Sequence, residues 1–226
     1  MSSRVNSGRA RIARKSARRP SARTRRPEET RARILDAAWG EFSDKGLGGA
    51  RVDAIAARAG ANKRMIYHYF ASKAGLYLAV LERAYDRIRG HERELAVEDC
   101  APEEGIRRLV AYNFDFCRDN PDFIRLLNNE NLHKARHLAK SRQVQAVNLP
   151  VIDTIRRILD RGVQAGIFRD GVDALDLYLT IAALGFFYFS NIHTLSVVFG
   201  RNLADPSAIA ARRQVHEDVV LGHLRP

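Results

Sequence analysis

Residues 62–73 bring several hydrogen-bond donors together in one short stretch. Lysine and arginine bind phosphate oxygens, and amide, hydroxyl and ring N–H groups donate to phosphates or to base edges in the major groove. The apolar residues between them, which can anchor the opposite face of a helix to a core, are Met65, Ile66, Tyr69 and Phe70. This combination predicts a helix that docks on DNA. The residues we expect at the DNA are Arg51, Asn62, Lys63, Arg64, Tyr67, His68 and Lys73.

Short helices must position these side chains. Apolar residues recur at three- and four-residue spacing from Ile34 to Phe42, and Lys45-Gly46 closes that helix. A second helix, built on Val52, Ile55, Ala56 and Ala59, stops at Gly60. Asn62 is suited to cap a third helix, and Ser72 a long fourth one. Two short helices joined by a tight glycine-containing turn form a helix-turn-helix.

The stretch from Ile55 to Leu76 closely resembles the signature of the tetracycline-repressor (TetR) family. The resemblance is carried by Ile-Ala-x-x-Ala-Gly at 55–60, Tyr-His-Tyr-Phe at 67–70 and Ser-Lys-x-x-Leu at 72–76. It implies DNA binding by the third helix and a phosphate contact from Lys73. The chain departs from the family at two positions. Family members often have Thr before the second helix, where this chain has Arg51-Val52. They often have Ser at the cap of the third helix, where this chain has Asn62. We expect Arg51 to replace a hydroxyl contact with an ionic one.

A second, weaker resemblance covers the later part of the chain. Residues 116–123, 129–132 and 186–199 are similar to the regulatory domain of pyrimidine-responsive repressors of the same family. This similarity supports membership of the family and names no ligand.

The remaining sequence is helical in pattern throughout. Proline and glycine breaks, Pro150 among them, divide it into helices that include 103–118, 121–138, 148–165, 172–199 and 206–223. The fold class predicted is therefore all-α, with an N-terminal three-helix DNA-binding domain and a helical-bundle domain for ligand binding and dimerisation. We expect a disordered basic tail at 1–27, the helix-turn-helix domain at 28–75, and the regulatory and dimerisation domain at 76–226.

The net charge of +12 is concentrated at the N-terminus. Residues 1–26 contain ten Lys or Arg and no acidic residue, which leaves a net charge of +2 on the other 200 residues. The tail lacks the apolar core of a signal peptide. It is either an arm that seeks phosphates or a solvated segment without a partner. Because we find no apolar window of 18 residues, we expect a soluble, cytoplasmic protein that does not enter the membrane.

Aromatic and polar residues of the later helices are candidates for an effector site, in which a few polar groups orient a molecule among apolar walls. These candidates are Tyr112, Phe116, Tyr188, Asn191 and His193. Core packing at a dimer interface is the alternative interpretation. The last two helices are apolar enough to pair across a two-fold axis, so we expect a homodimer through them.

Other chemistry finds little support. Glu130, His133 and His137 share a helical face at i, i+3 and i+7 and could ligate a metal, but the second Glu-x-x-His copy of metal bundles is missing. We interpret them as a solvated face and expect no metal and no other cofactor. Since no catalytic constellation stands out, we predict that the protein is not an enzyme.

The leading hypothesis is a ligand-responsive transcriptional regulator of repressor type. It would bind pseudo-palindromic, double-stranded operator DNA as a homodimer and be released by a small-molecule effector. The alternative is a nucleoid-type DNA-binding protein without a ligand switch. Salt dependence and sequence preference of binding distinguish the two, because purely ionic binding tracks salt and tolerates any sequence.

Overall fold

The structure, a computed structural model, describes the backbone of residues 22–226 and the side chains of residues 27–226. This part of the chain is helical and contains no strand. Its elements are α1 (Ala22–Gly49), α2 (Val52–Ala59), α3 (Lys63–Phe70), α4 (Lys73–Glu94), η1 (Val97–Asp99), α5 (Pro102–Asp119), α6 (Pro121–Leu132), η2 (Leu138–Lys140), α7 (Arg142–Gln164), α8 (Ala174–Val198) and α9 (Pro206–Leu224).

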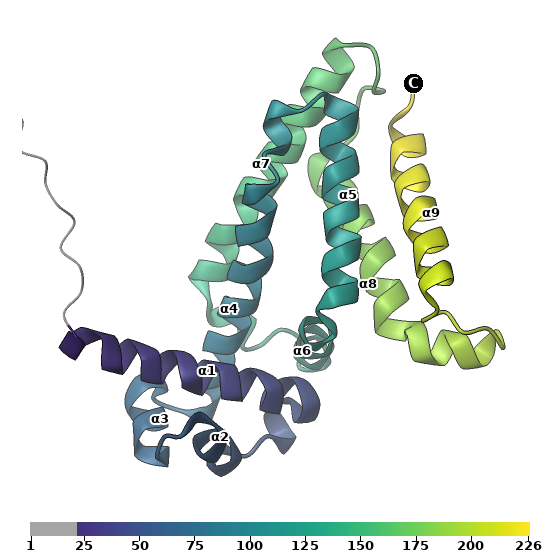
Figure 1. The fold of residues 1–226 in the computed structure, drawn as a ribbon. Helices are drawn as coiled ribbons and strands as arrows, with labels where there is room; N and C mark the ends of the chain where they lie inside the picture. The colour runs from purple at the N-terminus through teal and green to yellow at the C-terminus, as the bar shows by residue number, and fades with distance from the viewer. Residues whose placement is uncertain (1–21) are drawn as a thin grey trace, which may run out of the picture.

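The helices form two connected units. Figure 1 shows α1, α2 and α3 gathered at one end, while α4 leads away from them alongside α7, and α8 and α9 form a hairpin on the other side of α5. Ile34, Phe42, Ile55 and Ile66 are buried in the core of the first unit. Leu76 of α4 belongs to that same core, whereas the C-terminal half of α4 packs against α5 and α6. Helix α4 therefore contributes to both units, and α6 also reaches the first unit, because Leu126 lies in its core.

The first unit is joined to α6 through a glycine. Gly46 interrupts α1 with a positive φ of 62°, as the Lys45-Gly46 pattern predicts, and one further turn runs on to Gly49. A Cβ atom at Gly46 would lie 2.3 Å from a side-chain atom of Asn129 on α6. Only glycine satisfies both the backbone conformation and this close approach.

Two predicted helix limits are wrong. The helix expected over 121–138 ends at Leu132, because Lys134 and Ala135 adopt positive φ values that no α-helix contains. The helix expected to start at 148 starts at Arg142, where the Ser141 side chain caps it, and continues through Pro150. Burial of Val144, Ile155 and similar residues offsets the hydrogen bond lost at the proline. Helix α1 begins at Ala22, inside the segment 1–27 expected as a tail, and residues 1–21 lie outside the described residues.

Helix α8 is unusually apolar for its position. By length and composition alone it could cross a membrane, whereas we find no apolar window of 18 residues in the sequence. The core helix of a soluble protein can have the same length and composition. Only 17% of its most apolar window is buried within the chain. The helix thus leaves a large apolar surface uncovered, including Leu179 and Phe187.

Candidate functional site

The turn between α2 and α3 is set by two residues. Gly60 ends α2 in the left-handed conformation (φ 58°, ψ 37°), and its N–H donates to the carbonyls of Ala56 and Ala57. Asn62 then begins α3 in extended backbone, and its side-chain oxygen accepts a hydrogen bond of 2.9 Å from the Met65 N–H. A left-handed glycine followed by a polar cap gives the tight turn expected from the sequence.

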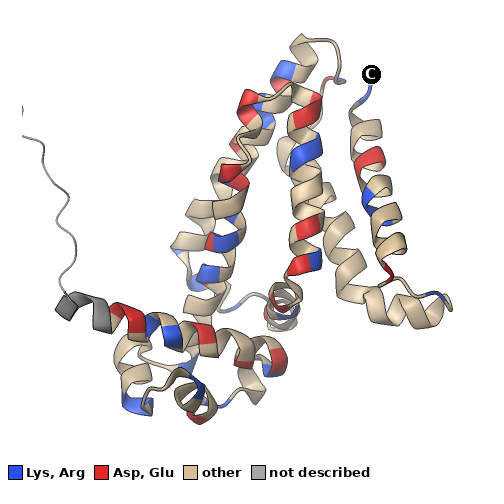
Figure 2. Cartoon of the chain, viewed as in Figure 1, with Lys and Arg blue, Asp and Glu red and all other residues tan. Residues whose placement is uncertain are grey.

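Helix α3 has one buried and one exposed face. Ile66 and Phe70 are buried in the first core, and Met65 and Tyr69 are partly buried against it. The residues exposed on the helix are Lys63, Arg64, Tyr67 and His68. Figure 2 shows that Lys and Arg lie at the end of the molecule that α2 and α3 form. The donors predicted for DNA therefore share an open surface, supported from behind by a packed core.

The cations of this surface are held loosely. The Lys63 ammonium lies 3.1 Å from a carboxylate oxygen of Asp53, and both side chains are about half exposed or more. Such a pair contributes little free energy in water, so Lys63 can exchange Asp53 for a phosphate at little cost. The exposed Arg51 has its backbone N–H fixed by the Glu41 carboxylate at 3.1 Å. A hydrogen bond from Lys45 is the main cause that lowers the pKa of Glu41, which keeps this acceptor ionised.

The N-terminus of α4 forms a second donor cluster. Ser72 caps the helix by accepting from the Gly75 N–H at 2.9 Å, and Lys73 reaches the Gly48 carbonyl at 3.4 Å. A Cβ at Gly75 would lie 2.2 Å from the Phe70 carbonyl oxygen, so glycine is required for α4 to start this close to the end of α3. Free N–H groups at a helix start, next to a lysine, favour binding of a phosphate.

The five effector candidates do not share one cavity. The Tyr112 hydroxyl donates to the Ile88 carbonyl at 2.9 Å, and the Tyr188 hydroxyl donates to the Leu203 carbonyl at 2.7 Å. Phe116 is buried against Phe123, with 5.2 Å between ring centroids. Asn191 bonds the carbonyl of Phe187 on its own helix. The exposed His193 lines a cavity of about 290 Å³ between the α5–α6 corner and α8.

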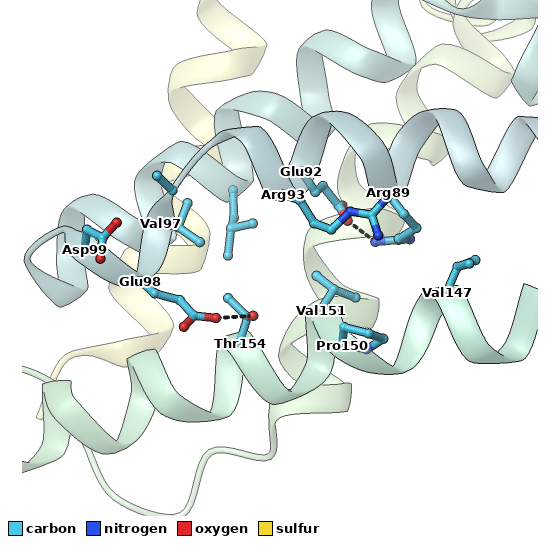
Figure 3. Close-up of a pocket in the computed structure, with 12 residues that line it drawn as sticks. Arg89, Glu92, Arg93, Val97, Glu98, Asp99, Val147, Pro150, Val151 and Thr154 are labelled. Atoms are coloured by element: carbon cyan, nitrogen blue, oxygen red, sulfur yellow. Dashed lines mark hydrogen bonds and ion pairs between the residues drawn. The ribbon is translucent and has the colours of Figure 1, made fainter. Parts of the chain in front are cut away.

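A different cavity, of about 350 Å³, opens between the end of α4, η1 and α7. None of the five candidates lines it. Its apolar wall includes Val147, Pro150 and Val151 of α7. Figure 3 shows Arg89 and Glu92 of α4 across from these residues, joined by an ion pair. We call this space the α4–α7 cavity.

Arg89 and Glu92 were not among the predicted site residues. Their side chains are 4% and 7% exposed, and Arg89 also donates to the hydroxyl of Tyr178 on α8. In the sequence, the only sign of this pair is the Arg-x-x-Glu spacing beside the apolar Ile88. Exposed ion pairs on helix surfaces have the same spacing, so it does not indicate a buried pair. Burial of this pair depends on α7 and α8, far away in the sequence.

The face of Glu130, His133 and His137 is wrongly predicted as solvated. Glu130 is 3% exposed, and its carboxylate accepts from the backbone N–H groups of His137 and Leu138 and contacts the His137 ring at 2.9 Å. Since α6 ends at Leu132, the three residues do not share a helical face. The carboxylate serves instead to hold the link from α6 to η2.

Comparison with known proteins identifies both units. Residues 34–80 match the family described as bacterial regulatory proteins, tetR family, and residues 102–220 match the tetracyclin repressor-like C-terminal domain. The chain belongs to the TetR family. The resemblance seen in residues 55–76 is therefore confirmed, and it extends over the regulatory part of the chain.

Named relatives within the TetR family are transcriptional regulators. The HTH-type transcriptional repressor NicS of Pseudomonas putida is 38% identical over 208 residues, which are 92% of this chain and 98% of that protein. The HTH-type transcriptional regulator RutR of Escherichia coli K12 is 34% identical over 110 residues, 49% of this chain and 51% of that protein. A solved structure of the transcriptional regulator SCO4942 from Streptomyces coelicolor has a TM-score of 0.66 at 27% identity and covers 87% of this chain and 99% of that one.

These similarities confirm the predicted all-α fold with an N-terminal helix-turn-helix. The protein is a DNA-binding transcriptional regulator of the TetR family. Nothing in the comparisons favours the nucleoid-type alternative, and the names of the relatives describe regulators and not enzymes.

Proposed function

We propose that this TetR-family regulator represses transcription in the cytoplasm by binding a pseudo-palindromic operator as a homodimer, and that a small-molecule effector releases it. The exposed row of donors on α3, supported by a buried apolar face, is the observation that carries the proposal. A helix of this kind enters the major groove with its donors toward the base edges. Repression is supported by NicS, a named repressor that is 38% identical over 98% of its own length.

The proposed contacts with DNA come from two groups of residues. Arg64, Tyr67 and His68 are exposed on α3 and face the bases or the adjoining backbone. Lys63 releases Asp53 and Lys73 releases the Gly48 carbonyl when each meets a phosphate. The phosphate contacts fix register, and the contacts from α3 provide sequence preference.

The first test is a binding titration with an operator selected by the full-length protein from random duplexes. Tyr67→Ala and Lys73→Ala should each weaken operator binding by about 1 kcal/mol or more at fixed salt, the value of one good contact. Both side chains are at least partly exposed, so thermal unfolding should change little.

Arg108→Ala is the matched control, because Arg108 is an exposed cation on α5, paired with Glu104 and far from α3. Its affinity for the operator should equal that of the wild type. Unchanged affinity in both test variants would rule out this docking surface, and equal affinity for every duplex would favour the nucleoid-type alternative.

The uncovered apolar face of α8 and α9 supports the dimer. Phe187 and Leu179 on α8 are 58% and 53% exposed, and Val215 and Val219 on α9 are nearly half exposed. Monomeric soluble proteins rarely leave so large an apolar patch open to water. Pairing two such hairpins across a two-fold axis covers it with four helices, and the resulting dimer presents two copies of α3 to successive major grooves, about 34–36 Å apart.

The second test disrupts this face. Phe187→Glu should convert the dimer to monomers or aggregates in analytical ultracentrifugation, because a buried, unpaired carboxylate at the centre of the interface is strongly unfavourable. Leu132→Glu is the control, since Leu132 is 81% exposed on α6 and belongs to neither α8 nor α9. A stable monomeric wild-type protein would contradict the proposal.

The effector is proposed to bind the α4–α7 cavity. The C-terminal half of α4 forms one wall of that cavity, and the N-terminus of the same helix carries Lys73 and the proposed phosphate site. A shift of α4 on binding would therefore move the donors of one DNA half-site relative to those of the other. The effector must bind the released conformation more tightly than the DNA-bound one, since equal affinity would change nothing.

A further inference from the structure

The α4–α7 cavity combines apolar walls with one buried cation. Val97, Leu109, Val147 and Val151 line it, and the space of about 350 Å³ is partly open to solvent. Such walls suit an aromatic or aliphatic body of modest size. The polar groups on the α4 wall then decide which head group such a molecule carries.

Arg89, which lines this cavity, carries one donor that is unused within the described residues. One terminal nitrogen of its guanidinium contacts Glu92, and the other donates to the Tyr178 hydroxyl, whose ring lies 5.0 Å from the guanidinium carbon. Its Nε atom is buried and has no hydrogen-bond partner. An unpaired buried donor on a charged group costs free energy, so an acceptor that reaches Nε recovers that cost.

The charges around Arg89 favour an anionic acceptor. Arg93 lies on the same wall, so two cations face one acid, Glu92. Burial raises the pKa of Glu92, so the negatively charged form of this carboxyl group is less favourable than in water. At the far end of the cavity, Glu98 is already bound by Thr154 at 2.7 Å and by Arg157, and Asp99 lies beside it on η1. The acids of η1 thus lie away from Arg89 (Figure 3).

We propose that the α4–α7 cavity binds a small monocarboxylate with an apolar ring or chain, and that its carboxylate accepts a hydrogen bond from Arg89 Nε. The apolar body lies against Val147, Pro150 and Val151 of α7. This inference rests on the proposed function, because it names the chemical class of the effector for the same cavity. A carboxylate is preferred to a neutral acceptor because charge-assisted hydrogen bonds to guanidinium are the stronger ones.

The test compares two probes of nearly equal shape, benzoate and benzamide, by isothermal titration calorimetry on the full-length protein. Benzoate should bind at least about tenfold more tightly than benzamide, the factor expected for a charge-assisted hydrogen bond. In ¹⁵N NMR spectra, the Nε–H resonance assigned to Arg89 should shift on adding benzoate and stay in place on adding benzamide.

Variants locate the site. Arg89→Lys keeps the charge but removes Nε, and should weaken benzoate binding about tenfold or more. Because this change can leave Glu92 unpaired, the double variant Arg89→Gln with Glu92→Gln removes both charges together and should lose the preference for benzoate over benzamide. Arg156→Lys is the matched control, since Arg156 is exposed on α7 and pairs with Asp153; it should bind benzoate as the wild type does.

Equal binding of the two probes, undiminished benzoate binding by both Arg89 variants, or no benzoate binding at millimolar concentration would overturn the proposal. Operator titrations on the same samples separate it from the proposed function. A protein that binds its operator but fails these ligand tests refutes only the carboxylate site. A protein that passes them but binds no specific duplex refutes the proposed function alone.

Discussion

His216 is a buried side chain in the regulatory core whose protonation depends on folding. Its ring is 1% exposed between α8 and α9, and Nε2 lies 3.0 Å from the Ile181 carbonyl. Burial is the main cause that lowers its pKa to about 4, so the native protein holds the ring neutral through most of the acidic range. With Nε2 donating to Ile181, Nδ1 is an acceptor that has no partner.

This produces a defined pH dependence of stability. The unfolded chain protonates His216 near pH 6.5, whereas the folded chain does so only near pH 4. Between these values the unfolded state binds more protons, so the free energy of unfolding falls as the pH is lowered from about 6.5 to about 4, and His216 adds no further loss below that. Urea unfolding of the wild type at intervals across this range measures the effect.

His216→Gln isolates the contribution of this residue. The glutamine amide can still donate to the Ile181 carbonyl but does not titrate. The variant should therefore lose less stability between pH 6.5 and pH 4 than the wild type, with the difference confined to that window. Parallel curves for the two proteins would show that His216 is not the group responsible.

At the scale of the element, the link from α6 to η2 is held under backbone strain. Lys134 and Ala135 have φ values of 56° and 54°, a conformation that side chains other than glycine disfavour by about 1–2 kcal/mol per residue. The Glu130 carboxylate binds the N–H groups of His137 and Leu138, and so holds the chain after the turn in place. The turn persists because these buried contacts outweigh its local cost.

Ala135→Gly should therefore raise the free energy of unfolding, by about 1 kcal/mol or less, because relief of strain exceeds the added entropy of the unfolded chain. Ala139→Gly is the matched control: Ala139 lies four residues on and is not among the described positive-φ positions, so this change should lower stability. Urea unfolding at pH 7 compares the three proteins. A loss of stability in Ala135→Gly equal to that in the control would contradict the strain at this turn.

These elements also show where sequence reasoning succeeds and where it fails. The helix-turn-helix could be predicted because its signals are local: Gly60 ends α2, Asn62 caps α3, and Ile66 and Phe70 define the buried face. The end of α6 could not, because the acceptor that stabilises the turn is a glutamate that reads as a surface residue in a helical pattern. The sequence also predicts a break at Pro150, because it does not show the packing of α7 that tolerates a proline within the helix.

The candidate site was also only partly predictable from the sequence. Exposure of the α3 donors follows from helical spacing alone, so all four could be identified. Two of the five effector candidates, Tyr112 and Tyr188, instead use their hydroxyl groups to bond backbone carbonyls. Arg89 could not be predicted from the sequence, because its burial arises from the packing of α4 against α7 and α8, which spacing within α4 does not show.

At the scale of the whole molecule, charge is distributed very unevenly. Ten cations lie within residues 1–26, and seven of these lie within 1–21, outside the described part of the chain. The next residues enter α1, which packs on α2 within the first unit. We expect a segment so rich in arginine, joined to the unit that carries α3, to add long-range attraction to DNA without reading its sequence.

Deletion of residues 1–21 should accordingly leave operator preference unchanged while reducing affinity for every duplex. Each phosphate contact contributes about 0.9 to the slope of log K against log salt, so loss of seven cations should flatten that slope by up to about 6. The measurement is fluorescence anisotropy across a salt series with operator and scrambled duplexes. A full-length variant with those seven residues changed to Gln separates charge from length, and should behave as the deletion does. If both variants keep the wild-type slope, the tail does not contact DNA, and the charge of the molecule acts on DNA only through the helix-turn-helix surface.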